Sequence, residues 1–165
     1  DLAVPYREAG GWTSAELPYK GNQLTAYAIL PPTGSTCADV TGATLTALTT
    51  GPSRQQTSLQ MPSLDLAQPH DLLDPLQTLG LPTNGDYSGL GPQADSINTV
   101  IQKVLLKVDR KGTEAAAATG IGATLSCGHV GPPHSLVLDR PSLLVIQDTK
   151  TGTPLFLTRV SDPTA

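Results

Sequence analysis

The stretch from residue 97 to residue 119 constrains the fold more than any other part of the chain. It begins with INTVIQKVLLKV at residues 97–108, whose β-branched and apolar side chains predict a long strand. GTEAAAAT follows at residues 112–119, although alanine is the best helix former and a poor strand former. Local preference and context disagree here, which is expected of a segment with two competing states. A flexible Ala-Gly loop is the simpler interpretation of the tract taken alone.

The composition predicts a loop-rich fold with a thin core. The 165 residues include 16 glycines and 15 prolines, which favour many breaks and few long helices. Hydrophobic residues make up 38% of the chain and aromatic residues only 4%, so Leu, Val and Ala must supply most of the core. The length fits a single domain over residues 1–165, and no internal repeat divides it.

Strands are the most frequent elements that the sequence predicts besides residues 97–108. They cover residues 15–30 as a hairpin, 57–66 as an irregular strand, and 135–147 and 154–160 as a C-terminal hairpin near the first one. Lys20-Gly21-Asn22 supplies the first turn, since Gly and Asn accept positive φ at low cost.

Helices are expected to be few and short. Residues 71–80 carry leucines at helical spacing, with Asp71 as the cap and Gly80 as the stop. Residues 33–56 read mostly as loop, with one short helix at best. The predicted fold class is therefore α+β, with mostly antiparallel β-sheets and one or two short helices.

Charge, hydropathy and motifs exclude several classes of function. A net charge of −4 without a run of Lys or Arg disfavours nucleic acid as a partner. No stretch approaches the ~20 apolar residues that span a bilayer, and the first residues lack the pattern of a signal peptide. We expect no metal and no cofactor, because no paired cysteines with metal spacing and no phosphate-binding glycine loop occur.

A catalytic triad is also not expected. His70, His129 or His134 could serve as its base, but there is no Gly-x-Ser-x-Gly elbow, and the last two lie beside a Gly-Pro-Pro segment typical of exposed loops. We expect no enzyme and no catalytic residue. The two cysteines, Cys37 and Cys127, do not form a disulfide framework, and both could be free thiols.

Four blocks of the sequence resemble serpins, a family of protease inhibitors. Residues 97–119 resemble the strand that leads into the proximal hinge of the serpin reactive loop, with Gly112, Thr113 and the four alanines at matching positions. The other blocks are ELPYKGN at 16–22, DYSGL at 86–90 and LDRPSLLVIQDTKTGTPLFLTRVSDP at 138–163, which resemble the sheet B hairpin, an acidic-aromatic-Ser-Gly turn and the C-terminal strands. They follow the family's order, from about Tyr6 to Pro163. The resemblance covers only the C-terminal part of a serpin, so we expect a partial serpin fold without the N-terminal part. We also expect a bacterial-type member of the family.

The resemblance implies a serine protease inhibitor that acts through a cleavable reactive loop at about residues 112–134. In the family, the cleaved loop enters a β-sheet as an extra strand while the protease is held as an acyl-enzyme. The hinge residues that the resemblance implies are Gly112, Thr113, Glu114, Ala115, Ala116, Ala117, Ala118 and Thr119. With period 2, Thr113, Ala115, Ala117, Thr119 and Ile121 would face the core side of that sheet. Small side chains would enter with little steric resistance. The family also implies an extracellular protein.

The scissile bond has two candidate positions. Family spacing counted forward from Gly112 gives Leu125, Ser126 and Cys127, and spacing counted backward from Arg140 gives His129 and Val130. No Lys or Arg lies between Lys111 and Arg140, so neither candidate position offers the basic side chain that a trypsin-like pocket binds. The expected target is a serine protease of apolar or small-residue preference, such as a chymotrypsin-, elastase- or subtilisin-like enzyme.

Three departures from the serpin pattern keep other functions open. Arg110 stands where inhibitory members usually carry Glu, Ser142 replaces an expected Phe, and Thr158 an expected Gly. The alternatives are a non-inhibitory serpin-fold protein and an incomplete serpin that is a protease substrate.

Since the loop should insert between residues 97–108 and a strand of the N-terminal part, we expect the isolated chain to be cleaved rather than to trap its protease. The exposed edge of 97–108 would favour self-association.

Overall fold

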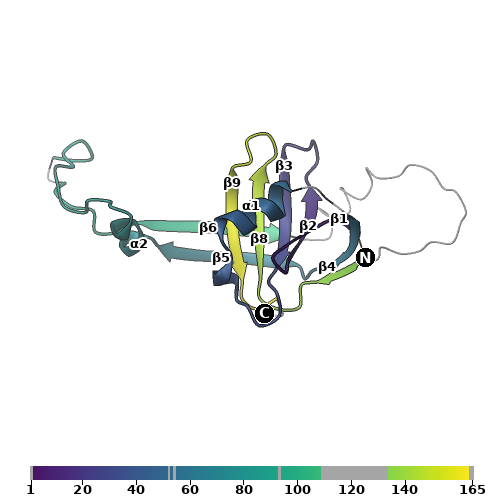
Figure 1. Ribbon diagram of the computed structural model, residues 1–165. Helices are drawn as coiled ribbons and strands as arrows, with labels where there is room; N and C mark the ends of the chain where they lie inside the picture. The colour runs from purple at the N-terminus through teal and green to yellow at the C-terminus, as the bar shows by residue number, and fades with distance from the viewer. Residues whose placement is uncertain (1, 52, 54, 93, 109–133, 164–165) are drawn as a thin grey trace, which may run out of the picture. The chain divides into compact units, whose positions relative to one another are not determined.

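A computed structural model describes residues 2–51, 53, 55–92, 94–108 and 134–163 (Figure 1). Contacts divide the chain into two compact units. The first unit comprises Asp1–Ser63 and Asp109–Ala165, and the second unit comprises Leu64–Val108. That residues 1–165 form one serpin-like domain stays a prediction.

A seven-stranded sheet builds the first unit. Its strands are β1 (Leu2–Ala9), β2 (Trp12–Pro18), β3 (Leu24–Leu30), β4 (Gln55–Gln60), β7 (His134–Val137), β8 (Ser142–Asp148) and β9 (Pro154–Val160). Their order across the sheet is β7-β4-β1-β2-β3-β8-β9. All neighbours are antiparallel except β4 and β7, which run parallel.

Tight turns join the first three strands where the sequence allows positive φ. Gly10 and Gly11, with φ of 58° and 81°, connect β1 to β2. Gly21 and Asn22, with φ of 88° and 54°, lie in the turn between β2 and β3. This confirms the predicted turn, because both residue types enter the left-handed region more readily than others.

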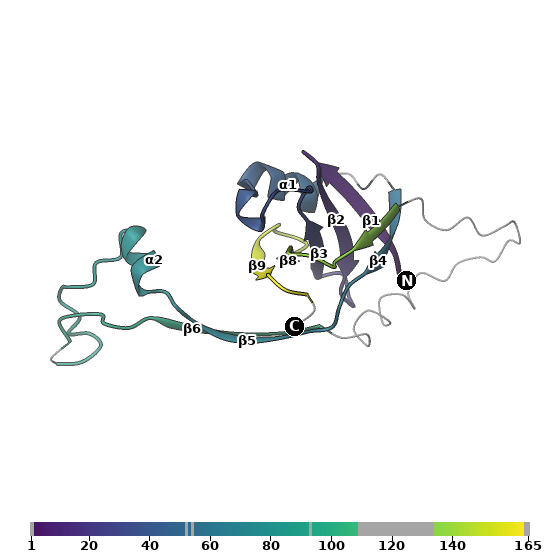
Figure 2. The same ribbon diagram turned by 90° about the horizontal axis from the view of Figure 1, so that it is seen from below.

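One face of this sheet is covered by α1 (Gly42–Thr50), as Figure 2 shows. The side chain of Thr41 caps the helix by accepting a hydrogen bond from the Thr44 amide at 3.1 Å. A 3-10 turn, η1 (Cys37–Asp39), precedes it with a capping box between Thr36 and Asp39. The buried cluster on this face consists of Trp12, Tyr27, Ile29, Cys37, Leu48, Leu143 and Val145.

Side chains on the other face of the central strands are buried as well. Ala15, Ala28 and Leu144 alternate with the residues that face α1, and all three are buried. For this reason β3 and β8 read as nearly continuous apolar runs rather than as alternating patterns. Both strands were predictable from the sequence alone.

An antiparallel pair of strands builds the second unit. β5 (Leu64–Asp71) pairs with β6 (Ile101–Val108), with Leu64 opposite Val108. The short helix α2 (Leu73–Thr78) follows β5, and the Asp71 carboxylate accepts a hydrogen bond from the Leu73 amide at 2.9 Å. Asp71 thus satisfies an amide of the first turn, although the helix is shorter than predicted.

The mostly antiparallel α+β fold class is confirmed, and several boundaries are corrected. The predicted strand at 57–66 is two strands, β4 and β5, which belong to different sheets because Pro62 interrupts the pairing. The strand predicted at 97–108 begins at Ile101, and 135–147 is divided between β7 and β8. β1 was not predicted. In the described part of the chain, no helix has the length and apolar character needed to cross a membrane.

Candidate functional site: the two strands that flank the predicted reactive loop

The residues predicted for the reactive loop lie outside the described residues. They are Gly112, Thr113, Glu114, Ala115, Ala116, Ala117, Ala118, Thr119, Leu125, Ser126 and Cys127, together with Arg110, His129 and Val130. The structure describes the strands on either side of them. β6 ends at Val108 on the N-terminal side, and β7 begins at His134 on the C-terminal side. These two strands lie in different sheets.

β6 offers a free strand edge on the N-terminal flank. Among the described residues it pairs only with β5, so no other described strand occupies its outer edge. One face carries the buried Leu106, and the other carries Ile101 and Leu105, which are 58% and 69% exposed. An ion pair of 3.2 Å joins Lys107 to Asp65 across the two strands. An edge of this kind can accept an added strand.

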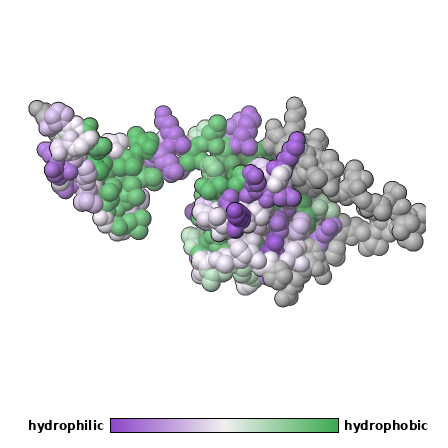
Figure 3. All heavy atoms as spheres, turned by 90° about the horizontal axis from the view of Figure 1, so that it is seen from above, coloured by the Kyte–Doolittle hydropathy of each residue, from purple (hydrophilic) through white to green (hydrophobic). Residues whose placement is uncertain are grey.

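Exposed hydrophobic residues are prominent in the second unit. Figure 3 shows green, hydrophobic residues over it, and the large ones with more than half of their surface exposed are Leu79, Leu90, Ile101 and Leu105. Ile101 and Leu105 lie on one face of β6, whereas Leu79 and Leu90 lie outside any strand.

β7 on the C-terminal flank is short and lies at the edge of the seven-stranded sheet. Among the described strands it pairs with β4 alone, in parallel, with His134 opposite Thr57. Leu136 is its one buried residue, and beyond its end the Leu138 amide donates a hydrogen bond to the Gln60 carbonyl at 2.9 Å.

Tyr6 contacts the first residue of β7. Its ring stacks on that of His134 with centroids 5.0 Å apart and planes inclined by 9°. Burial raises the pKa of Tyr6 above 10.0, and the nearby carboxylate of Glu8 raises it further. Sequence analysis did not single out Tyr6, because Pro5 and the polar residues after it interrupt the apolar pattern by which a strand such as β1 is predicted.

Arg140 fixes the connection that follows β7. Its Nη2 donates a hydrogen bond to the Pro31 carbonyl at 3.3 Å, which ties the β7–β8 connection to the end of β3. This assigns a structural role to Arg140 within the block at 138–163.

Glu16, from the block ELPYKGN, also has a structural role. Its Oε2 lies 2.6 Å from Nη1 of Arg7, and the two side chains are only 22% and 11% exposed. The contact is an ion pair without the alignment of a hydrogen bond, whereas Nε of Arg7 donates to the Gly51 carbonyl at the end of α1. The guanidinium also lies 5.6 Å from the centre of the Tyr27 ring.

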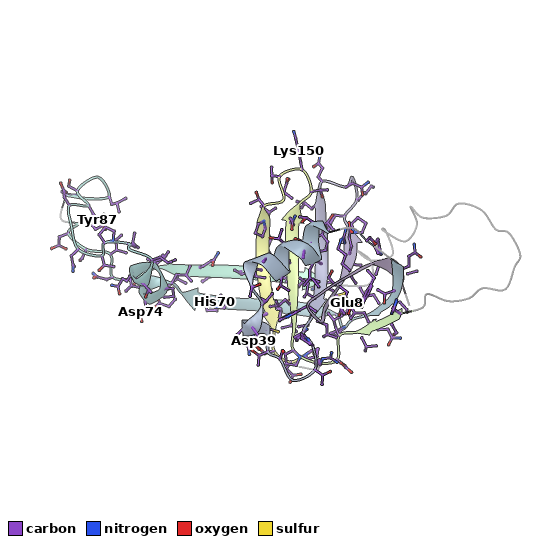
Figure 4. All side chains as sticks on the ribbon, in the orientation of Figure 1. Glu8, Asp39, His70, Asp74, Tyr87 and Lys150 are labelled. Atoms are coloured by element: carbon purple, nitrogen blue, oxygen red, sulfur yellow. The ribbon has the colours of Figure 1, made fainter. Side chains whose placement is uncertain are left out.

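The described polar residues do not form a cluster of potential metal ligands. Three or more potential metal ligands gather nowhere in the described ranges. His70 lies on β5 and is exposed, and Figure 4 labels it there. Cys37 is a buried free thiol, and burial raises its pKa although Arg159 acts in the opposite direction. A thiol of this kind is a poor nucleophile.

Comparison with known proteins identifies the family. The family model described as "Serpin (serine protease inhibitor)" matches residues 2–163. The chain belongs to the serpin family. Serpins are protease inhibitors, so the expectation that the chain is not an enzyme is confirmed by its family.

Individual serpins match nearly the whole chain, but the chain matches less than half of each. Plasminogen activator inhibitor 1 of Sus scrofa is 29% identical over 90% of the chain and 39% of its own length. An alpha-1-antitrypsin-like protein of Tamias sibiricus is 31% identical over 90% of the chain and 37% of its own length. The chain thus spans about two fifths of the curated relatives that it matches. A bacterial-type origin stays a prediction.

Solved structures show the same fold. The native state of tengpin, a thermophilic serpin, superposes with a TM-score of 0.73 at 20% identity and covers 97% of this chain and 44% of its own. The serpin-12 of Manduca sexta gives the same TM-score at 16% identity, with 99% and 44% covered.

Two departures from the serpin pattern have visible consequences. Ser142, where Phe was expected, is 1% exposed, and its hydroxyl has no hydrogen-bond partner among the described residues. Thr158, where Gly was expected, lies in β9 opposite Leu144 and is partly exposed. The first departure places an unsatisfied polar group in the interior, while the second is accommodated within a regular strand pair.

Proposed function

We propose that the protein is a serpin-type inhibitor of serine proteases and that residues of about 112–134 form its reactive loop. The observation that carries this proposal is the outer edge of β6, which no described strand occupies and which precedes the predicted hinge in the chain. A strand added to this edge would gain a ladder of backbone hydrogen bonds, each contributing about 1 kcal/mol net. Over a full strand this sum is comparable to the stability of a small domain.

The size of the loop is compatible with this mechanism. Residues 113–126, in extended form, would span about 46 Å, at about 3.3 Å for each residue. A protease attached near Leu125, Ser126 or Cys127 would therefore be carried far from its first docking position. Alanines at 115–118 would add to the sheet without steric conflict.

The proposed target is a serine protease with an apolar or small primary pocket. Leu125 would suit an apolar pocket, and residues 112–139 contain no Lys or Arg for a trypsin-like pocket. Chymotrypsin, elastase and subtilisin are therefore the test enzymes, and trypsin is the matched negative control.

A second candidate function is that of a protease substrate without inhibitory activity. It is favoured by the same edge of β6, which has no strand opposite it among the described residues to form the second wall of an insertion site. Cleavage would then release no stored free energy, and nothing would compete with hydrolysis of the acyl-enzyme.

One experiment separates the two candidates. The purified 165-residue chain is incubated with each protease, and the products are followed on denaturing gels together with residual protease activity. An inhibitor forms a stoichiometric adduct that survives SDS, whereas a substrate is cut within 120–131 and leaves the protease active. An adduct would support the first candidate, and cleavage without an adduct would support the second. A first cut outside 112–134 would contradict both candidates.

A further inference from the structure

β7 is a short strand at one edge of the seven-stranded sheet. β7 has four residues and, within the ranges that the structure describes, pairs on one side only. The pairing is parallel, which is slightly less stable for each residue than antiparallel pairing. His134, Ser135 and Val137 are exposed, so burial of apolar surface within the strand depends on Leu136. Some further contact is needed to keep the beginning of the strand in register.

The ring of Tyr6 supplies such a contact. Tyr6 belongs to β1, which lies two positions from β7 in the sheet, with β4 between them. The stack on His134 therefore spans β4 and joins β7 to a strand with which it forms no backbone pair. Nearly parallel rings with centroids 5.0 Å apart lie in the attractive range for aromatic pairs.

We propose that Tyr6 is a positioning residue, which holds the start of β7 in the sheet by stacking on His134. Through β7 it fixes the C-terminal end of the candidate reactive loop. The second statement rests on the proposed function. The first concerns the sheet alone and holds whatever the loop does.

Hydrogen exchange at two amides tests the proposal. The Leu138 amide, bonded to the Gln60 carbonyl at 2.9 Å, reports on β7, and the Thr149 amide, bonded to the Gln23 carbonyl at 2.9 Å, reports on the sheet near β3 and β8. Tyr6→Ala should speed exchange at Leu138 about two- to twelve-fold, the equilibrium change that corresponds to an aromatic pair. Exchange at Thr149 should stay as in the wild type.

Matched variants separate stacking from general destabilisation. Tyr6→Phe retains the ring and should behave as the wild type, whereas His134→Ala should also speed exchange at Leu138. In the double variant the two effects should be less than additive, as expected for two residues in contact. Tyr19→Ala removes another partly exposed tyrosine, which lies outside this contact, and should leave Leu138 unaffected.

Limited digestion with subtilisin gives a second readout. Cuts within residues 134–138 should appear in Tyr6→Ala and not in Tyr6→Phe. The proposal is overturned if Leu138 and Thr149 respond equally, or if His134→Ala leaves Leu138 unchanged. If the protease assay of the wild type contradicts the proposed function, the exchange result still stands by itself, so the two failures are distinguishable.

Discussion

The hydroxyl of Ser14 donates a hydrogen bond of 2.8 Å to the backbone carbonyl of Leu48, and both residues are 0% exposed. Ser14 lies in β2, and Leu48 lies in the last turn of α1, where carbonyl groups lack partners within the helix. The bond therefore completes the hydrogen bonding of the helix end and attaches the helix to the sheet.

Ser14→Ala should destabilise the protein. The Leu48 carbonyl would remain buried without its partner, which costs about 1–3 kcal/mol in the free energy of unfolding. Urea denaturation followed by the fluorescence of Trp12, a member of the same buried cluster, measures the change. Ser161→Ala, at an exposed position, is the control and should have no effect.

Ser142→Ala should stabilise the protein, in contrast to Ser14→Ala. Its hydroxyl is as buried as that of Ser14 but has no hydrogen-bond partner among the described residues. Its removal should raise the free energy of unfolding by about 1 kcal/mol, because a desolvated polar group is lost and no bond is broken. A loss of stability as large as that of Ser14→Ala would reveal a partner and contradict this account.

Asp148→Ala should weaken the turn between β8 and β9 in a pH-dependent manner. The Asp148 carboxylate accepts three hydrogen bonds, from the amide and the hydroxyl of Thr151 and from the amide of Lys150. Figure 4 labels Lys150 in this turn. Hydrogen bonding, first from the Thr151 amide and then from its hydroxyl, lowers the pKa of Asp148 below 3.8. A carboxyl with a lowered pKa stabilises the fold fully above its ordinary value and loses this effect as the pH falls through the lowered value.

The difference in stability between wild type and Asp148→Ala should therefore be complete at pH 7 and shrink below about pH 3.8. Denaturation midpoints measured from pH 2 to pH 7 test this. Thr151→Ala keeps the amide donor and should show a smaller difference with the same direction. A difference that is independent of pH would show that the charge of the carboxylate is not involved.

Leu105→Lys should reduce self-association of the chain. Leu105 is 69% exposed on β6, whose outer edge is unpaired in the described part of the chain, and a lysine on an edge strand opposes pairing with another copy. Sedimentation velocity over a range of concentrations measures the effect. Leu79→Lys, at a residue 83% exposed but outside any strand, should change nothing. If only Leu157→Lys in β9 abolishes association, the copies pair through the other sheet.

Local pattern was sufficient for the strands that are apolar along their length. β3 and β9 were predicted near their observed bounds, and β8 was predicted as part of a longer strand at 135–147. All three carry a run of apolar residues, although most residues of β9 are exposed. β1 was missed because Pro5 reads as a breaker. In the sheet, Pro5 pairs with Gln56 of β4 and lies outside the register shared with β2, so its missing N–H is tolerated.

Sequence analysis could suggest only those parts of the candidate site that lie within one continuous segment. The hinge and scissile residues were inferred from the resemblance to serpins, and they stay predictions. The Tyr6–His134 contact depends on the pairing of β1 with β4 and of β4 with β7, which joins segments far apart in the chain. No single segment contains that information, because register between distant strands is set by the assembled sheet.

The placement of β7, β8 and β9 has a consequence for a nicked chain. Wherever the backbone is cut between residues 109 and 133, the C-terminal piece keeps all three strands, with β7 paired to β4 and β8 paired between β3 and β9. The C-terminal piece thus contributes three strands to a sheet whose other four strands belong to the N-terminal piece. The nicked protein should behave as a non-covalent heterodimer that sediments as one particle in native buffer and separates into two polypeptides only when the sheet is denatured.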